Sequence, residues 1–286
     1  MPTLRQTIRQ TVYQAEKLAQ RAKFASLPTP EGGWPILLGI SFPKSGTHLL
    51  DQILLGFNAV APYSLHVASM FANYDGATGR KRGADETLAW LRTLRSCDVA
   101  SAHLFSLPEA VEYVCTPAFV PYFIYRDPRD IVVSHVFYVT EMEPNHVQHE
   151  YFASLPDFDT RLKTSILGRP EAEVEFFDIG TRFQAYAAWL DQPSVLQIHF
   201  EDLVNDRTAA LNRIIDHCLA RAPLAAPRET ILAALETSIN PKKSPTFRSG
   251  KTGEWKKHFT DEHKALFKEV AGDLLIKLGY EKDREW

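Results

Sequence analysis

The sequence has few cysteines, no long apolar run and no excess of one charge. Its 286 residues include three cysteines, Cys97, Cys115 and Cys218, which share no metal-ligand spacing and indicate a reducing compartment. The apolar runs are too short to span a bilayer and no signal-peptide segment is evident, so we expect a cytoplasmic protein without a transmembrane segment. With 32 basic and 35 acidic residues, the net charge of −3 argues against binding along a nucleic-acid backbone.

We expect residues 1–33 to form an N-terminal amphipathic helix and linker, and residues 34–286 to form one domain. Apolar residues recur at helical spacing from Leu4 to Ala22, and the prolines and glycines of residues 28–33 end the helix. The opposite face is basic. We therefore expect the helix to pack its apolar face on the domain and to leave the basic face in solvent. The alternative is peripheral contact with an anionic membrane.

Short apolar segments alternate with helical patterns along the rest of the chain. Residues 36–41, 99–103, 122–125 and 195–199 predict buried strands, and residues 108–114, 128–139 and 208–219 predict helices. This alternation predicts an α/β fold with a mainly parallel sheet flanked by helices, which binds ligands at the carboxyl ends of its strands. Residues 141–182 lack a clean period, and we expect them to form a lid over the sheet.

The first predicted strand leads directly into the loop Pro-Lys-Ser-Gly-Thr at residues 43–47. Successive backbone N–H groups at a helix N-terminus bind oxyanions, and Lys44, Ser45 and Thr47 add a charge and two hydroxyl groups. The common nucleotide loop has a glycine directly before its lysine, and this loop has none. The sequence therefore predicts a phosphate-type loop that differs from the loop of ATPases and GTPases.

Two later segments also suit an anion. Arg126 ends a predicted strand, Asp127 and Pro128 mark a helix start, and Ser134 lies about two turns into that helix. Near the C-terminus, residues 247–256 read Phe-Arg-Ser-Gly-Lys-Thr-Gly-Glu-Trp-Lys, a basic segment whose two glycines suit a loop that closes over an anion.

The order and spacing of these three motifs resemble the cytosolic-type sulfotransferase family over about residues 36–259. The resemblance implies a P-loop nucleotide-transferase-like fold. It also implies transfer of a sulfuryl group from 3′-phosphoadenosine 5′-phosphosulfate (PAPS), without a metal, to a hydroxyl or amine of a small organic, lipid or glycan acceptor.

The resemblance implies a role for individual residues. His103 is the expected general base, since a histidine titrates close to neutral pH, and Lys44 is expected to stabilise the leaving group. The expected donor-binding residues are Lys44, Ser45, Gly46, Thr47 and His48 around the 5′-phosphosulfate, Arg126, Ser134, Arg248, Ser249 and Gly250 around the 3′-phosphate, and Phe200 and Thr237 beside the adenine.

The chain departs from the family pattern at Leu49, where an adenine-stacking tryptophan is common, and at Ser101 and Ser249, where lysines are common. Two alternatives stay open: an ATP-dependent P-loop kinase and a non-catalytic nucleotide-binding protein of the same fold. The acceptor is expected among residues that are mostly aromatic and suit an apolar ring. These residues are Tyr63, His66, Met70, Phe71, Tyr74, Phe137, Tyr138, Met142, His146, Tyr151 and Phe152.

Overall fold

The computed structural model describes residues 4–222, 224–244 and 250–286, with side chains from residue 11 onward. The strands are β1 (Ile36–Ser41), β2 (Met70–Ala72), β3 (Val99–His103), β4 (Phe119–Tyr125) and β5 (Leu196–His199). The α-helices are α1 (Leu4–Lys23), α2 (Thr47–Gly56), α3 (Ala84–Leu91), α4 (Pro108–Val114), α5 (Pro128–Phe137), α6 (His149–Ser154), α7 (Phe158–Leu167), α8 (Ile179–Gln184), α9 (Phe200–Asn205), α10 (Arg207–Leu219), α11 (Arg228–Ser238), α12 (Asp261–Ala271) and α13 (Leu274–Lys277).

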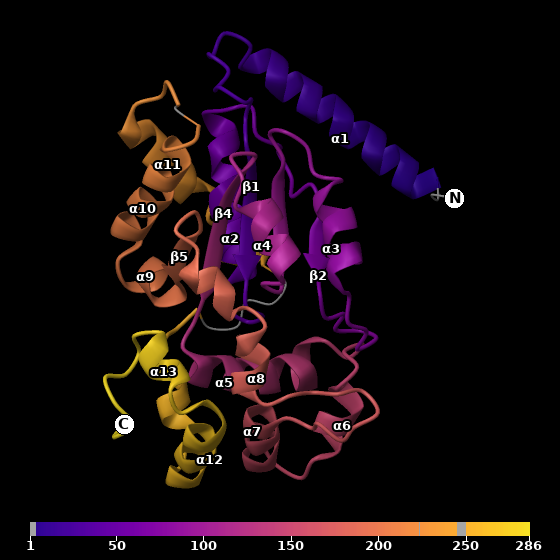
Figure 1. Ribbon diagram of the computed structural model, residues 1–286, viewed down its shortest axis with the longest axis vertical. Coiled ribbons are helices and arrows are strands. Elements are labelled where there is room, and N and C mark those ends of the chain that lie inside the picture. Colours follow the sequence, from indigo (N-terminus) through magenta and orange to yellow (C-terminus); the bar gives the residue numbers. More distant parts are fainter. Residues whose placement is uncertain (1–3, 223, 245–249) are drawn as a thin grey trace.

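The five strands form one parallel sheet in the order β2-β3-β1-β4-β5, which confirms the predicted α/β class. β1 lies between β3 and β4, with Ile40 opposite Ala102 and Ser41 opposite Ile124. The carboxyl ends of the strands therefore share one edge of the sheet. In Figure 1 this is the lower edge, beyond which α5 to α8 and α12 gather.

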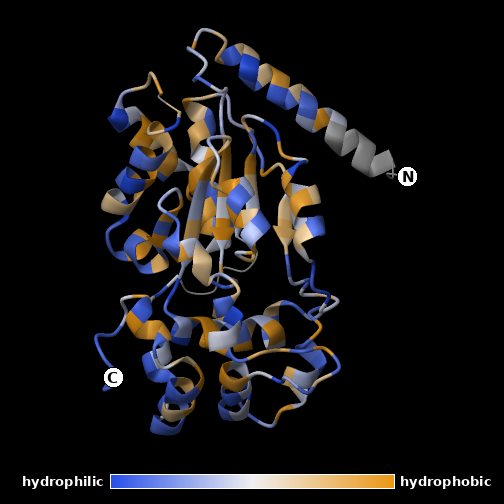
Figure 2. Cartoon of the chain, in the orientation of Figure 1, coloured by the Kyte–Doolittle hydropathy of each residue, from blue (hydrophilic) through white to orange (hydrophobic). Residues whose placement is uncertain are grey.

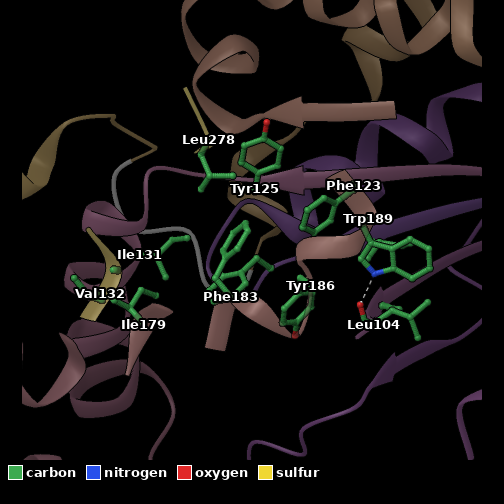
Figure 3. Close-up of a cluster of buried hydrophobic side chains, with 14 of the residues drawn as sticks. Leu104, Phe123, Tyr125, Ile131, Val132, Ile179, Phe183, Tyr186, Trp189 and Leu278 are labelled. Carbon is green, nitrogen blue, oxygen red and sulfur yellow. Dashed lines mark hydrogen bonds between the residues drawn. The ribbon is translucent and has the colours of Figure 1, made fainter. Parts of the chain in front are cut away.

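Alternate residues of the strands supply two separate cores, one on each face of the sheet. Leu38 and Ile40 belong to one buried cluster and Leu37 to the other. Both faces of a parallel sheet are covered by helices, so its strands are mostly apolar, and they are largely orange in Figure 2. In the first cluster, Phe123, Phe183 and Tyr186 pack together, and the buried Trp189 indole donates a 2.8 Å hydrogen bond to the Leu104 carbonyl (Figure 3).

The expected lid, residues 141–182, contains ordered helices. The turn at Tyr138–Met142 is π-helical, and α6, α7 and the start of α8 follow it. Asp157 and Asp178 cap α7 and α8 by accepting hydrogen bonds from Thr160 N and Thr181 N. These helices lie beyond the carboxyl edge of the sheet in Figure 1.

The N-terminal helix α1 forms as predicted, but the prediction for its buried face is wrong. Lys17 and Gln20 are buried, whereas Leu18 is 66% exposed. Lys17 forms an ion pair with the buried Asp98, directly before β3, and the Tyr13 hydroxyl donates to the same carboxylate. The buried Lys17–Asp98 ion pair therefore determines which face of α1 packs on the domain, and the apolar face is exposed to solvent. Among the described residues, no helix is both long and apolar enough to cross a membrane.

This orientation predicts that substitutions at two neighbouring residues of α1 change the free energy of unfolding by very different amounts. Lys17→Met leaves a buried carboxylate without its cation, so we expect a loss of about 3 kcal/mol in the free energy of unfolding. Leu18→Ser changes an exposed side chain, and we expect a change below about 0.5 kcal/mol. Denaturant unfolding of both variants measures the difference, and a larger loss for Leu18→Ser than for Lys17→Met would contradict the orientation.

Candidate active site

A cavity of about 900 Å³ opens at the carboxyl edge of the sheet. Segments far apart in the chain line it, because the loops after β1, β3, β4 and β5 all emerge there. The predicted site residues that line it are Lys44, Gly46, Thr47, His48, His103, Arg126, Ser134, Phe200 and Gly250. Arg248 and Ser249 lie outside the described residues. Thr237 is exposed on α11 and does not line the cavity, although Ile239 and Pro241 just after it do.

The loop between β1 and α2 has the backbone of an anion site. Lys44 and Gly46 have positive φ values of 69° and 98°. A side chain at Gly46 would place its Cβ 2.7 Å from the Phe200 ring, so the position requires glycine on two grounds. The Ser45 hydroxyl is buried and has no hydrogen-bond partner in the structure. A buried polar group without a partner at a helix N-terminus suits a bound oxyanion.

The side chain of His103 is fixed through its Nδ1 atom. Nδ1 lies 3.0 Å from the Ser41 carbonyl oxygen and 3.1 Å from the Ser41 hydroxyl. A carbonyl only accepts, so Nδ1 carries the proton and Nε2 keeps its lone pair. The Ser41 hydroxyl also lies 2.9 Å from the Thr47 hydroxyl, which connects His103 to the anion loop. Ser41 was not among the predicted site residues, although its position directly before the anion loop could have indicated a role in the site.

Burial and nearby charges keep His103 neutral. Burial lowers the pKa of His103 to about 4, the charges of Lys44 and His48 add to the effect, and the bond to the Ser41 carbonyl opposes it. Burial and the Lys44 charge also lower the pKa of His48. His103 therefore remains an unprotonated proton acceptor throughout the neutral range.

Helix α5 and the C-terminal segment meet at Arg126. Its Nη2 atom donates to the Asp130 carboxylate at 3.0 Å and to the Lys251 carbonyl at 2.6 Å, while its buried Nε has no hydrogen-bond partner. Asp130 accepts hydrogen bonds from Gly253 N and Trp255 N, each at 2.8 Å. This carboxylate therefore brings the segment that begins at Gly250 beside Arg126.

Apolar residues form the adenine side of the expected donor site. Phe200 begins α9 and stacks under the Arg126 guanidinium at 4.8 Å. Leu49, Leu203 and Ile239 line the same cavity, and none of the three was among the predicted site residues. Ser101, where relatives often have lysine, is buried and does not line the cavity.

The rest of the cavity, which we call the acceptor end, lies beside α5 and the π-helical turn. Ile131, His135 and Tyr138 line it at helical spacing, and the Lys44 ammonium lies 3.7 Å from the centre of the Tyr138 ring. Among the expected acceptor residues, those that line the cavity are Met70, Tyr74, Tyr138, Met142 and His146.

The other expected acceptor residues have different surroundings. Tyr63 and Phe152 are fully buried in the two cores, and Phe71 stacks on Trp90. The exposed His66 lies beside Glu16, 3.5 Å away. Phe137 packs on Phe158, and Tyr151 lies under the Arg169 guanidinium. The aromatic pattern alone therefore did not separate pocket residues from core residues. No group of three or more potential metal ligands occurs among the described residues.

The fold and the site define an α/β transferase with an anion loop and a buried histidine at adjacent strand ends. The chain belongs to the sulfotransferase domain family, whose model matches residues 36–279. It is a sulfotransferase, and membership in this family decides against the kinase alternative. No curated protein matches the chain in sequence.

Solved structures share this fold at low sequence identity. Mouse sulfotransferase SULT7A1 complexed with PAP is 15% identical, with a TM-score of 0.58 over 87% of this chain and 88% of that one. Retinol dehydratase with androsterone and the inactive cofactor PAP is 15% identical, with a TM-score of 0.56 over 91% and 85% of the two chains. Retinol dehydratase with retinol and PAP is 16% identical, with a TM-score of 0.57 over the same shares.

The neutral state of His103 is directly measurable. In the ligand-free protein we expect the imidazole to titrate near pH 4, well below the ordinary value of 6.5, because burial disfavours the charged ring. The unfolded chain protonates this histidine below about pH 6.5, whereas the folded protein does so only near pH 4. The free energy of unfolding is therefore unaffected by this group above pH 6.5 and decreases as the pH falls from 6.5 toward 4. NMR of the ring protons, assigned with His103→Gln, measures the value. A pKa at or above 6.5 would contradict the described environment.

Proposed function

We propose that the protein transfers the sulfuryl group of PAPS to a hydroxyl group of an acceptor bound at the acceptor end of the cavity. The observation that carries the proposal is the contact of His103 with Ser41, directly before the anion loop, which supports a role of the neutral imidazole as the base. The family assignment supports sulfotransfer, and the PAP complexes of the solved structures support PAPS as the donor.

Polar groups without partners fit the two anionic ends of this donor. Ser45 Oγ lies in the anion loop and Arg126 Nε lies near Gly250, and neither has a hydrogen-bond partner in the structure. The loop amides, Lys44, Ser45 and Thr47 would hold the 5′-phosphosulfate, with His48 at its edge. Arg126, Ser134 and Gly250, with the predicted Arg248 and Ser249, would hold the 3′-phosphate. Phe200 and Ile239 would contact the adenine, and Thr237 remains a prediction.

When bound, the donor supplies a sulfuryl group activated by its anhydride bond to phosphate. His103 Nε2 takes the proton from the acceptor hydroxyl as the new sulfur–oxygen bond forms. The Ser41 carbonyl accepts from Nδ1 and stabilises the resulting imidazolium. Lys44 and the loop amides stabilise the negative charge that develops on the phosphate oxygen as the anhydride bond breaks, an effect worth about 3–4 kcal/mol per donor.

The chain of hydroxyl groups couples the base to the donor. The single Nδ1 proton is shared between the carbonyl and hydroxyl oxygens of Ser41. The Ser41 hydroxyl can then donate to Thr47 Oγ1, and the Thr47 hydroxyl to the phosphosulfate. Donor binding thereby orders His103 for the acceptor. The acceptor end takes a small organic molecule, since Met70, Tyr138, Met142 and Tyr186 provide apolar contacts in an enclosed cavity. We further propose that the reaction takes place in the cytoplasm, needs no metal, and uses residues 34–286 as the catalytic domain.

Substitution of the base tests the proposal. We expect His103→Ala to lower the turnover of PAPS with phenolic acceptors by about two to four orders of magnitude, because proton removal loses its catalyst. The variant should still bind PAP, since His103 is not among the donor ligands. Turnover is measured as PAP released over a panel of phenols.

A matched histidine provides the control. His66 is exposed, lies outside the cavity and faces Glu16 on α1, so His66→Ala should retain normal turnover. Turnover of His103→Ala close to that of the wild type would remove His103 as the base.

A further inference from the structure

Arg182 contributes a cation to the acceptor end of the cavity. It belongs to α8 and lines the cavity together with Tyr74, Phe176 and Tyr186. Its Nη2 atom donates to the Ser165 carbonyl at 2.6 Å, and its guanidinium lies 4.3 Å from the centre of the Phe176 ring. The side chain is therefore held in place by a backbone carbonyl and an aromatic face.

The charge of Arg182 has no carboxylate partner among the described residues. Its Nε atom is buried without a hydrogen-bond acceptor. The nearest acidic residue in sequence, Asp178, uses its carboxylate to cap α8 through Thr181 N at 2.8 Å and the Thr181 hydroxyl at 2.6 Å. Burial lowers the pKa of Arg182 to about 10, with the Asp178 charge opposing this, so the guanidinium stays charged at neutral pH.

A second polar group without a partner lies in the same part of the cavity. The Tyr74 hydroxyl is buried and makes no hydrogen bond of good geometry. Burial raises the pKa of this hydroxyl, and the nearby Gln148 side chain and the Arg182 charge oppose the shift. Buried charges and hydroxyl groups are normally paired, because leaving one unpaired costs about 1–3 kcal/mol or more. Two unsatisfied donors in one cavity indicate a ligand that supplies acceptor oxygens.

The other titratable groups of the acceptor end leave Arg182 unmatched. Glu175 is paired with Lys81 at 2.9 Å. Glu143 raises the pKa of His146, against the larger lowering effect of burial, and so lies beside that ring. Burial also holds the pKa of His135 well below its usual range, and Arg182 and Lys44 both add to this shift. Arg182 and Lys44 therefore both lie near His135 in one cavity.

We propose that the acceptor is a hydroxy acid, whose carboxylate is bound by Arg182 and Tyr74 while its hydroxyl group faces His103. This inference rests on the proposed sulfotransfer and adds the charge of the acceptor. A guanidinium binds a carboxylate through two N–H groups, and such charge-assisted bonds set the orientation of a ligand as well as its affinity. The aromatic walls would hold the carbon skeleton between the two ends.

Three phenols with an alkyl chain opposite the hydroxyl group, which differ in the charge at the end of that chain, test the charge preference. These are 3-(4-hydroxyphenyl)propionate, which is an anion, 4-ethylphenol, which is neutral, and tyramine, which is a cation. With PAPS and the full chain, we expect kcat/KM for the anion to exceed that for 4-ethylphenol by at least about 10-fold. In Arg182→Met the ratio should fall by about 10- to 100-fold, and in Tyr74→Phe by a smaller factor.

A matched arginine separates charge recognition from structural support. Arg161, on α7, also binds backbone carbonyls, those of Ala153 and Leu155, and also has a buried Nε without a partner, but it does not line the cavity. Arg161→Met should leave the ratio between anionic and neutral acceptors unchanged. A ratio within one variant is independent of how much active protein folds, so a general loss of stability would not move it.

A binding measurement keeps the inference separate from the proposed function. In the PAP complex, unreactive 3-phenylpropionate should raise the unfolding temperature of the wild type more than 3-phenylpropionamide does, and Arg182→Met should lose this difference.

Sulfation of 4-ethylphenol or tyramine at least as efficiently as of the anion, or an unchanged ratio in Arg182→Met, would overturn the inference and leave sulfotransfer standing. If Arg182→Met does not fold, the wild-type ratio and Tyr74→Phe decide. If the protein neither binds PAP nor sulfates any phenol, the proposed function is overturned. If it binds PAP but neither 3-phenylpropionate nor 3-phenylpropionamide, the inference is overturned.

Discussion

The register of three parallel strands determines the geometry of the site. β1 pairs with β3 so that Ile40 is opposite Ala102, and with β4 so that Ser41 is opposite Ile124. The next residue of β3 is His103, which therefore lies against Ser41, and Arg126 follows β4 at the same edge. A shift of one residue would turn alternate side chains to the other face of the sheet. The buried, tightly packed strands thus fix His103, the loop at residues 43–47 and Arg126 relative to one another.

A second constraint holds the distant part of the chain in this site. Asp130 is buried and accepts hydrogen bonds from two backbone amides, Gly253 and Trp255, as well as from Arg126. The same carboxylate therefore orients the arginine and anchors the segment that begins at Gly250. Arg126 and the segment from Gly250 onward are therefore held together without a ligand, which reduces the cost of ordering these residues on binding.

Local sequence patterns predicted the strands and helices that carry the site. The packing of α1 and the roles of Ser41 and Arg182 depend on tertiary contacts, which the sequence patterns do not show. The strand at 99–103 and the helix at 108–114 agree with β3 and α4 residue for residue, because apolar segments and proline set their limits. The edge strand β2 is three residues long and has no alternation to detect. The apolar face of α1 was identified correctly, but the Lys17–Asp98 pair, invisible to periodicity, docks the opposite face. The role of Ser41 depends on strand register, and Arg182 lies in a segment without a period, so neither could be found from the sequence.

Donor recognition is the central claim of this account, and thermal unfolding of the wild type with nucleotides tests it most directly. The ligands compared are adenosine 3′,5′-bisphosphate, 5′-ADP, and ATP with magnesium. At a hundred times its dissociation constant a ligand adds about 2.7 kcal/mol to the free energy of unfolding, which for a chain of this length is a shift of roughly 5–10 °C. We predict this shift with the bisphosphate and a much smaller one with 5′-ADP, since only the bisphosphate carries the 3′-phosphate that we propose Arg126 and Gly250 bind. A shift with ATP and magnesium but none with the bisphosphate would contradict the account.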